Sequence, residues 1–304
     1  MDAQPKGYLY EESKVIPYKL PDPLVCLDGT KVENAKLWLK KRRPEILKLF
    51  KEEVYGESPD NRIPMRIEMV EEGQDALGGK AIRKQAAILL GESNRTLSIN
   101  LLLYLPKVSN RPLPAFLTIN FQGNHTVHSD PAILLPNTWV RNRNGIKDNR
   151  AREKDRGLAA SRWAITDMIN RGYAFATVYY GDIDPDFDDG FQNGIHALFP
   201  LLDSEKRKWS DWGSIAGWAW GLSRCLDYLE QDPRIDGKRV AVMGHSRLGK
   251  TSLWVGAIDE RFAMVISNNS GCGGAALSRR RFGETVKRIN TSFPHWFCDN
   301  YKKY

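Results

Sequence analysis

The amino-acid sequence predicts a three-layer α/β sandwich around a mostly parallel sheet. In the second half of the chain, apolar runs of strand length alternate with helical patterns, which is typical of parallel strands joined by crossover helices. Four further strand candidates precede this alternation. The 304 residues contain no internal repeat, low-complexity tract or linker. We therefore expect a single domain over 1–304, with an irregular Pro-rich segment over 1–34 packed on it.

The first half of the chain is expected to hold one helix and four strands. A helical pattern covers 33–56, and Pro44 is expected to interrupt it. The apolar stripe of this helix would consist of Leu37, Leu39, Ile46, Leu47 and Phe50. Apolar runs bounded by turn residues predict strands at 62–72, 80–91, 96–106 and 113–123.

The second half supplies the alternation of helices and strands. Helical patterns cover 162–172, 211–233 and 246–259, and strand patterns cover 173–182, 234–244 and 262–271. Ser214 or Asp211 is expected to cap the second helix, and Pro233 to close it. The polar stretch 141–160 is expected to form an exposed loop.

Composition excludes several classes of function. The net charge is +8, but the basic residues are scattered and no nucleic-acid-binding module is recognisable, so we expect no nucleic-acid partner. No apolar run approaches the roughly 18 residues of a membrane span, and the N-terminus has no signal-peptide pattern. The four cysteines form no C-x-x-C pair, so we expect no zinc, while a disulfide stays open. Nine tryptophans suit a core and also sugar-stacking surfaces.

The stretch "VAVMGHSRLGKTSL" over 240–253 fits two motifs. Gly244, Gly249, Lys250 and Thr251 complete the phosphate-binding G-x-x-x-x-G-K-T pattern, whereas Ser246 between the two glycines resembles a nucleophile elbow. A phosphate loop needs an acidic residue on a neighbouring strand for Mg²⁺, and the next strand ends in asparagines. The motif also follows five or more strand candidates. Both observations favour the elbow.

An ester hydrolase also needs backbone donors for the oxyanion, from a loop that follows an earlier strand. The run "LPAFLTINFQGNHTV" has this form, with Gly123 in a polar turn and His125 close behind. We therefore expect the oxyanion loop at Gly123.

Four segments together resemble one family, the glucuronoyl esterases of carbohydrate esterase family fifteen. The segments are "NFQGNHTV", "SDWGSIAGWAWGLSRCLDYLE", "GHSRLGK" and "SNNSGCGGAALSRRRFGETVKRINTSFPHWF". The resemblance implies an α/β-hydrolase fold without metal or organic cofactor. It also implies cleavage of the ester between 4-O-methyl-glucuronic acid on xylan and lignin alcohols, in the periplasm or outside the cell.

The resemblance assigns roles to individual residues. Ser246 would be the nucleophile, and Arg247 would help to stabilise the oxyanion, for which a permanently charged guanidinium is suited. Lys250 would contact the uronate, and Glu284 would accept hydrogen bonds from sugar hydroxyls. The protein would act as a monomer on glucuronoxylan and lignin-derived uronate esters.

The resemblance assigns no residue of this chain as the general base. In hydrolases of this fold the acid and then the histidine follow the serine along the chain. Here Asn269 stands at one position of the family's acid, and His295 is the one histidine after Ser246. The family's catalytic histidine comes later, so we expect the base, and with it a C-terminal strand and helix, beyond Tyr304.

Two other interpretations of the missing base stay open. His295 could serve as the base with Asp299 as its orienting acid, or the chain could be a non-catalytic relative that binds glucuronoxylan. An acetyl-xylan or other carbohydrate esterase is the enzymatic alternative. A missing C-terminal segment is expected to leave a sheet edge and apolar surface exposed, and to make the chain poorly soluble.

Overall fold

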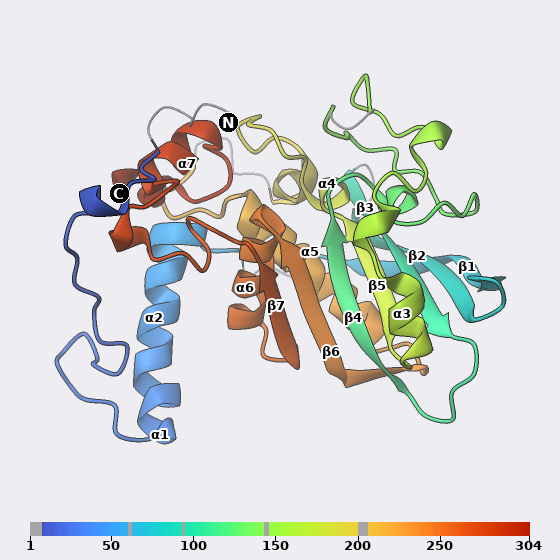
Figure 1. Cartoon of the computed structure of the whole chain (residues 1–304), viewed down its shortest axis with the longest axis horizontal. Helices are drawn as coiled ribbons and strands as arrows, with labels where there is room; N and C mark the ends of the chain where they lie inside the picture. The colour runs from blue at the N-terminus through green and yellow to red at the C-terminus, as the bar shows by residue number, and fades with distance from the viewer. Residues whose placement is uncertain (1–7, 60–62, 93–94, 143–145, 200–205) are drawn as a thin grey trace.

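A computed structural model describes residues 8–59, 63–92, 95–142, 146–199 and 206–304. One seven-stranded sheet crosses the molecule in the order β1-β2-β3-β5-β4-β6-β7 (Figure 1). The strands are β1 (Met65–Ala76), β2 (Ala81–Glu92), β3 (Arg95–Pro106), β4 (Leu113–Asn120), β5 (Ala174–Tyr179), β6 (Ile235–His245) and β7 (Met264–Asn268). The predicted α/β fold is confirmed, as are all the predicted strands, within a few residues at each end.

The sheet is mixed rather than mostly parallel. The pairs β5–β4, β4–β6 and β6–β7 are parallel, whereas the pairs β1–β2, β2–β3 and β3–β5 are antiparallel. The turn from β1 to β2 takes only four residues, which suffices for an antiparallel hairpin but not for a parallel crossover. The parallel half therefore begins at β4, where the connections carry helices.

Helices cover both faces of the sheet. In Figure 1, α3 lies in front of β4 and β5, while α5 and α6 lie behind the sheet. The α-helices are α1 (Ala35–Leu37), α2 (Arg43–Phe50), α3 (Ile165–Asn170), α4 (Tyr180–Ile183), α5 (Ser214–Leu229), α6 (Arg247–Ile258) and α7 (Val286–Ser292). A layer of strands between two layers of helices is the predicted sandwich.

The N-cap of α5 differs from the prediction. Gly213 occupies the cap position without a side-chain hydrogen bond, and Ser214 is the first helical residue. Asp211 instead accepts a hydrogen bond from the backbone N–H of Lys208 at 2.7 Å. The side chain of Asp211 therefore closes the turn before the helix rather than the helix itself.

Pro44 does not interrupt the first helix, contrary to the prediction. The chain is helical from Ala35 to Tyr55, with wide π turns at Trp38–Arg42 and Lys51–Tyr55. Pro44 directly follows the wide π turn Trp38–Arg42, in which the Arg43 N–H donates to the Trp38 carbonyl. The helix therefore accommodates the missing N–H of Pro44 through a wider turn and does not end there. Part of the predicted apolar stripe faces solvent: the Leu39 side chain is 56% exposed.

The stretch 141–160 is not simply an exposed loop. Ile146 and Asp155 are buried, and the Asp155 carboxylate accepts a hydrogen bond from the backbone N–H of Arg152 at 3.0 Å. Short 3-10 turns at Glu153–Asp155 and Ala160–Arg162 fold the stretch against the body of the protein. The polar composition of this stretch therefore predicted exposure, although some of its residues are buried.

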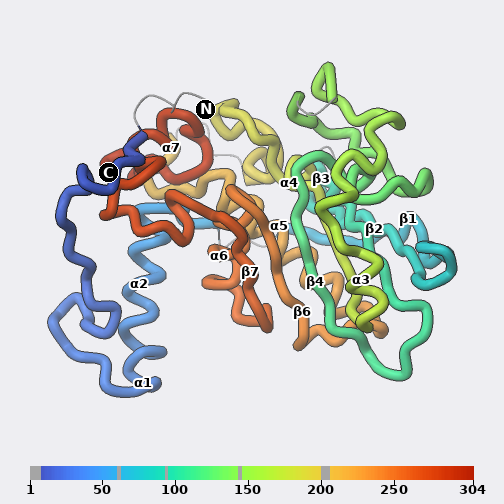
Figure 2. Tube along the Cα trace, in the orientation of Figure 1, coloured from blue at the N-terminus to red at the C-terminus, as the bar shows by residue number. Residues whose placement is uncertain are grey.

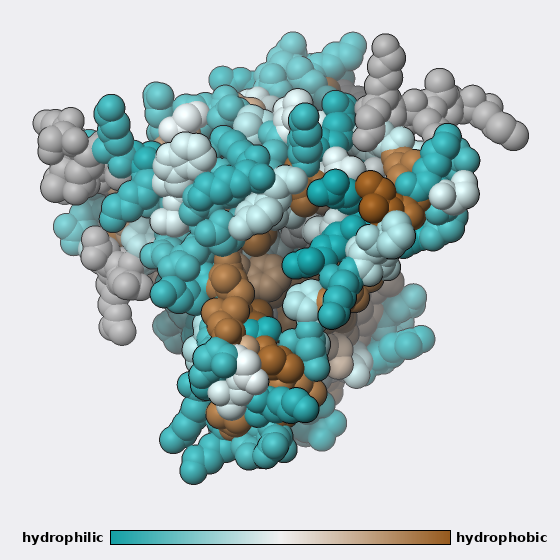
Figure 3. Space-filling model, turned by 90° about the vertical axis from the view of Figure 1, so that its left-hand side faces the viewer, coloured by the Kyte–Doolittle hydropathy of each residue, from teal (hydrophilic) through white to brown (hydrophobic). Residues whose placement is uncertain are grey.

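The N-terminal segment runs beside the C-terminal one, as the blue and red traces in Figure 2 show. Leu9 forms an antiparallel bridge with Gly283, and Glu12 pairs with Arg280. Figure 3 shows a band of hydrophobic side chains on the side of the molecule where α2 lies. A groove of about 970 Å³ there includes Leu49 and Phe50 of α2.

Strand β7 forms one edge of the sheet and is largely exposed. Met264 is 58% exposed, although parallel strands are usually covered on both faces. Among the described residues, no helix combines the length and the apolar character that a membrane crossing requires. All four cysteines are buried free thiols: Cys26, Cys225, Cys272 and Cys298.

Candidate active site

Ser246 lies at a sharp turn between β6 and α6. Its backbone has φ 57° and ψ −124°, a conformation that a residue with a side chain rarely adopts. Its N–H donates to the carbonyl of Asn268 at 2.8 Å, which ties the turn to the end of β7. A Cβ at Gly244 would come within 2.1 Å of the Leu248 carbonyl oxygen, so only glycine fits there. The turn thus holds Ser246 in a strained position at the carboxyl end of the parallel strands.

The same turn excludes the phosphate-loop interpretation. A phosphate loop needs an open loop up to the lysine, with the following hydroxyl free for Mg²⁺. Here α6 begins at Arg247, so Gly249 and Lys250 are already helical. Thr251 is fully buried, and its hydroxyl donates to the Arg247 carbonyl at 3.1 Å. Gly249 and Lys250 therefore do not form the open loop that the phosphate-binding pattern requires.

Arg247 and Lys250 lie against the same indole ring. The Arg247 guanidinium carbon is 4.7 Å from the centre of the Trp296 ring, and the Lys250 ammonium is 5.5 Å from it. The Arg247 guanidinium also lies 5.4 Å from the ring of Phe121, which directly follows β4. Its buried Nε has no hydrogen-bond partner among the described residues. The elbow and the loop after β4 therefore meet around a cation with an unused donor.

Lys250 is almost completely buried, with 3% of its surface exposed. Burial lowers the pKa of Lys250 to about 8, although the nearby charge of Glu284 favours the ammonium form. The Glu284 Oε1 accepts a hydrogen bond from the hydroxyl of Tyr8 at 3.3 Å. Lys250 and Glu284, which the sequence placed in one substrate site, are thus electrostatic neighbours in the structure.

Gly123 takes a conformation that only glycine adopts easily, with φ 100°. A Cβ there would lie 2.8 Å from His125 Nδ1 and from Pro136 Cγ. The Gly123 N–H donates to Asn120 Oδ1 at 2.9 Å, so this amide is not free for an oxyanion. Gly123 therefore contributes the shape of the loop rather than its own donor.

Gln122 offers a donor that sequence reasoning missed. Its side chain is buried, and its Nε2 has no hydrogen-bond partner in the described part of the chain. It lines a cavity of about 480 Å³ together with Gly244, His245 and Asn268, at the carboxyl ends of β6 and β7. The signal was available as "NFQG", because a polar residue after an apolar strand lies at this edge of the sheet.

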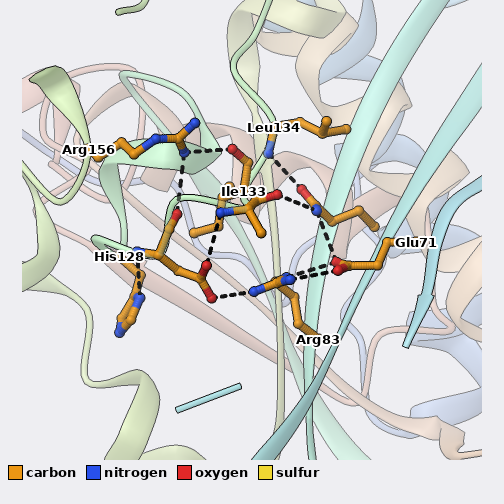
Figure 4. A network of polar contacts seen from close by, with 9 residues as sticks. Glu71, Arg83, His128, Ile133, Leu134 and Arg156 are labelled. Carbon is orange, nitrogen blue, oxygen red and sulfur yellow. Dashed lines mark hydrogen bonds and ion pairs between the residues drawn. The ribbon is translucent and has the colours of Figure 1, made fainter. Parts of the chain in front are cut away.

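A network of polar contacts holds the loop after β4 against the antiparallel strands (Figure 4). Arg83 of β2 donates to Glu71 of β1 at 2.6 Å and pairs with Asp130 of the loop. Gln85 Nε2 donates to Glu71 at 3.0 Å, and its Oε1 accepts from the Leu134 N–H at 2.8 Å. Arg83 and Gln85 of β2 therefore hold the loop that begins at Gln122, and Glu71 of β1 in turn holds these two side chains.

Four of the histidines do not approach the nucleophile as bases. Burial lowers the pKa of His125 to about 4, so its ring is neutral. The backbone N–H of Asp130 donates to His128 Nδ1 at 3.1 Å, within the network of Figure 4. His196 is buried beside Trp212. His245 is exposed on the strand side of the elbow.

His295 pairs with a carboxylate that the sequence did not suggest. Its Nε2 lies 3.0 Å from Asp186 Oδ1, and its Nδ1 is buried without a hydrogen-bond partner among the described residues. Asp299, the predicted orienting acid, instead pairs with Lys302 at 2.6 Å. The alternative of a His295–Asp299 pair is therefore excluded, because Asp299 begins a short helix that turns its carboxylate toward that lysine.

Asp186 is the centre of the buried polar cluster. It is fully buried, and its carboxylate lies 3.2 Å from Arg247 Nη1 and 2.8 Å from Arg141 Nη2. Burial opposes the ionisation of Asp186, but hydrogen bonds and the two arginines outweigh burial and hold its pKa below the usual range. The motif "GDIDPD" directly after an apolar strand was the sequence signal, since charged residues are rarely buried without partners.

The described residues offer one group of close metal-ligating atoms, Cys26, Asp28 and Glu45. Lys41 pairs with Asp28 at 2.5 Å, and Arg42 pairs with Glu45 at 3.1 Å. These cations already neutralise both carboxylates, so we assign no metal to the group.

Comparisons with known proteins agree with this geometry. Residues 165–304 match the family model "Glucuronyl esterase, fungi". The chain is 55% identical over 304 residues to the carbohydrate esterase MZ0003 from an unknown prokaryotic organism, covering 99% of this chain and 70% of that protein. The unmatched part of that relative is therefore close to a third of its length.

Solved structures extend the similarity to the whole fold. A promiscuous CE15 esterase from a marine bacterial metagenome superposes with a TM-score of 0.91 at 54% identity, covering 98% of this chain and 75% of that one. The glucuronoyl esterase from Solibacter usitatus gives a TM-score of 0.89 at 46% identity, covering 96% and 74%. With the strained serine elbow, these similarities show that the chain belongs to the glucuronoyl esterase family, carbohydrate esterase family fifteen, and is a carboxylic ester hydrolase of that type.

Proposed function

We propose that this protein hydrolyses esters between the 4-O-methyl-glucuronic acid groups of glucuronoxylan and lignin alcohols, through an acyl-enzyme on Ser246. The observation that carries the proposal is the strained turn at Ser246 with Arg247 and Lys250 beside it on the Trp296 ring. Ser246 makes no side-chain cap hydrogen bond, so its hydroxyl stays available to a substrate.

The reaction would proceed in two steps. The Ser246 Oγ attacks the uronate carbonyl carbon and loses its proton to a base, the bond to the alcohol oxygen breaks, and the alcohol leaves with a proton. Water then attacks the acyl-enzyme and releases the uronate. Each step places negative charge on the carbonyl oxygen, where the Arg247 guanidinium and a first-turn amide of α6 supply stabilisation.

The contacts of His295 favour a structural role over that of the general base. Its Nε2 faces Asp186, and its buried Nδ1 makes no hydrogen bond to the Ser246 hydroxyl or to any other described residue. The proposal therefore assigns the nucleophile, the oxyanion site and the sugar contacts to described residues, and does not assign the base to His295.

Lys250 and Glu284 would hold the sugar. The Lys250 ammonium is buried at one side of the Trp296 ring, where an oxygen of the uronate would replace the water that burial removes. Glu284 would accept hydrogen bonds from sugar hydroxyls in exchange with Tyr8. A polymeric substrate of this kind cannot enter a cell, which supports the expected periplasmic or extracellular location.

Hydrolysis of benzyl glucuronate by the 304-residue chain tests the proposal. We expect turnover that Ser246→Ala abolishes, and a rise in KM of about 10- to 100-fold in Lys250→Met, the usual size of a lost hydrogen bond to a charged group. Unchanged turnover in Ser246→Ala would contradict the nucleophile. A folded wild-type chain that binds 4-O-methyl-glucuronate without turning over the ester would show that the described residues bind the uronate but do not supply the general base.

The substrate range can be measured in the same assay. Acetylated xylan and aryl acetates lack the uronate that Lys250 and Glu284 would bind. If the protein turned over these esters at equal rates, and if Lys250→Met left those rates unchanged, a general carbohydrate esterase would be the better description.

A further inference from the structure

We propose that Asp186 is a positioning residue for ester hydrolysis, which holds the Arg247 guanidinium and the Trp296 indole in the places where the oxyanion site needs them. The inference rests on the proposed function, because it takes Arg247 as the cation that stabilises the oxyanion. Asp186 itself is fully buried and is not among the residues that line the three cavities of the described part of the chain. Its effect on the reaction must therefore pass through its partners.

One oxygen of Asp186 orients the aromatic platform. The Trp296 indole N–H donates to Asp186 Oδ1 at 2.7 Å, and His295 Nε2 lies 3.0 Å from the same oxygen. The Phe293 ring stacks on the Trp296 ring, with the ring centroids 3.7 Å apart and the two planes within 2° of parallel. The indole is thereby held in one orientation, and Arg247 lies against it.

The other oxygen of Asp186 binds two cations and a hydroxyl. Arg247 Nη1 lies 3.2 Å and Arg141 Nη2 2.8 Å from Oδ2, and the Tyr180 hydroxyl donates to it at 3.0 Å. Two guanidinium groups this close would repel each other without the carboxylate between them. Asp186 therefore supplies the charge that keeps Arg247 beside the elbow.

The ion pair does not use up the donors of Arg247. Its Nε has no hydrogen-bond partner among the described residues, and its Nη1 makes an ion pair with Asp186 that is not a well-aligned hydrogen bond. A guanidinium has five N–H donors in a planar fork, so one edge can hold an anion while another faces a substrate oxygen. An anchored cation with unused donors is the arrangement that preorganised oxyanion stabilisation requires.

A merely structural role makes a different prediction from a positioning role. A structural carboxylate would affect the folded fraction, and the molecules that fold would keep their kcat. A positioning carboxylate would change kcat in the folded protein with little change in KM, because the oxyanion exists only after attack on the ester. The two roles are therefore separable by kinetics on folded protein.

The kinetic test compares Asp186→Asn with Asp182→Asn, both assayed on benzyl glucuronate after circular dichroism confirms folding. Asp182 is a matched control, because it is buried in the same segment but bonds to Thr138 and Asn100 instead of to Arg247. We expect kcat to fall about 10- to 100-fold in Asp186→Asn, with KM within about twofold, because small misplacements of a catalytic group cost about this much. Asp182→Asn should keep the wild-type kcat.

A double-mutant cycle shows whether the effect passes through Arg247. In an Arg247→Lys background, Asp186→Asn should lower kcat by less than about threefold, because the guanidinium that it positions is already absent. Equal losses in both backgrounds would overturn the inference. If Asp186→Asn does not fold, Asp186→Glu keeps the charge but displaces it, and should show a smaller loss with the same dependence on Arg247.

A measurement without turnover separates this inference from the proposed function. In ¹⁵N-arginine-labelled protein, the Nε–H signal that disappears in Arg247→Lys reports on the buried Nε. We expect its exchange with solvent to be at least about tenfold faster in Asp186→Asn than in wild type and unchanged in Asp182→Asn. An unchanged exchange rate in Asp186→Asn would overturn the positioning role, even if the enzyme were inactive on every ester tested.

Discussion

Two aspartates four residues apart follow strand β5, and both are buried, but their surroundings move their pKa values in opposite directions. Burial raises the pKa of Asp182 to about 6, despite hydrogen bonds from Thr138 and Asn100. Burial acts on Asp186 as well, but there hydrogen bonds and two arginines outweigh it and lower the pKa. The difference lies in the partners, which are neutral at Asp182 and cationic at Asp186.

Only one of the two carboxylates has to carry a negative charge in the folded protein. Asp182 joins the middle of β3 to the segment before α3, a contact that a neutral acid or amide could also make. Asp186 must be ionised, because it lies between Arg141 and Arg247. A buried charge is tolerated where it neutralises others, and is a cost where it does not.

The largest expected effect is on stability at neutral pH. Asp186→Asn should lower the free energy of unfolding by about 3 kcal/mol, because it leaves two guanidinium groups without their anion. Asp182→Asn should stay within about 1 kcal/mol of wild type, because the amide keeps an oxygen for Thr138 and removes an unfavourable charge. Urea denaturation at pH 7 measures both values. Equal losses in the two variants would break the comparison.

The next effect is an opposite dependence on pH. The folded-state pKa of Asp182 is raised from 3.8 to about 6, so its contribution to stability is complete below pH 3.8 and is lost as the pH rises through 6. The advantage of wild type over Asp182→Asn should therefore shrink by about 2 kcal/mol between pH 4 and pH 8, which is most of the free-energy equivalent of that shift.

Asp186 has the reverse sign. Its folded-state pKa is lowered, so its contribution is present above the unfolded-state pKa of 3.8 and is lost as the pH falls through the lower value. The advantage of wild type over Asp186→Asn should stay constant from pH 8 to pH 5 and decrease only below about pH 4. Unfolding free energies at pH 4, 5, 6 and 8 test this, and parallel curves for the two variants would contradict the assignment.

Local patterns in the sequence were sufficient for the elements and the elbow. Each strand of the sheet and the helices α3, α5 and α6 are visible as apolar periodicities, and Ser246 follows from a strand, two glycines and a helix in succession. The antiparallel half of the sheet was not predicted, because periodicity reports burial and not the direction of the neighbouring strand. Pro44 was misjudged for a related reason, since periodicity does not show that a π turn beside a proline can keep the chain helical.

The cluster around Asp186 could not be predicted from local patterns. Its partners come from separate parts of the chain: Arg141 precedes α3, Arg247 begins α6, and Trp296 follows α7. Each of these residues has an ordinary local explanation, as a surface charge or an aromatic core residue. Their meeting depends on how β5 and β6 place their carboxyl ends beside each other across β4, which is a property of the sheet order.

The smallest expected effect comes from removing, for each aspartate, one neighbouring hydroxyl that donates a hydrogen bond to its carboxylate. The Thr138 hydroxyl donates to Asp182 at 2.7 Å, and the Tyr180 hydroxyl donates to Asp186 at 3.0 Å. Thr138→Val should cost about 2 kcal/mol at pH 8, where Asp182 is ionised, and about 1 kcal/mol at pH 5, where the protonated acid no longer depends on that donor. Tyr180→Phe should cost about 1 kcal/mol at both pH values.

The stricter of these two predictions is that Tyr180→Phe lowers the free energy of unfolding by the same amount at pH 5 and at pH 8. Asp186 keeps its arginines and its bond to Trp296 when the hydroxyl is removed, so it should remain ionised throughout this range. If the cost of Tyr180→Phe changed between pH 5 and pH 8 as that of Thr138→Val does, Asp186 would be exchanging a proton near neutral pH. A carboxylate that loses its charge there could not hold Arg247 in place, so this stability measurement also bears on the oxyanion site.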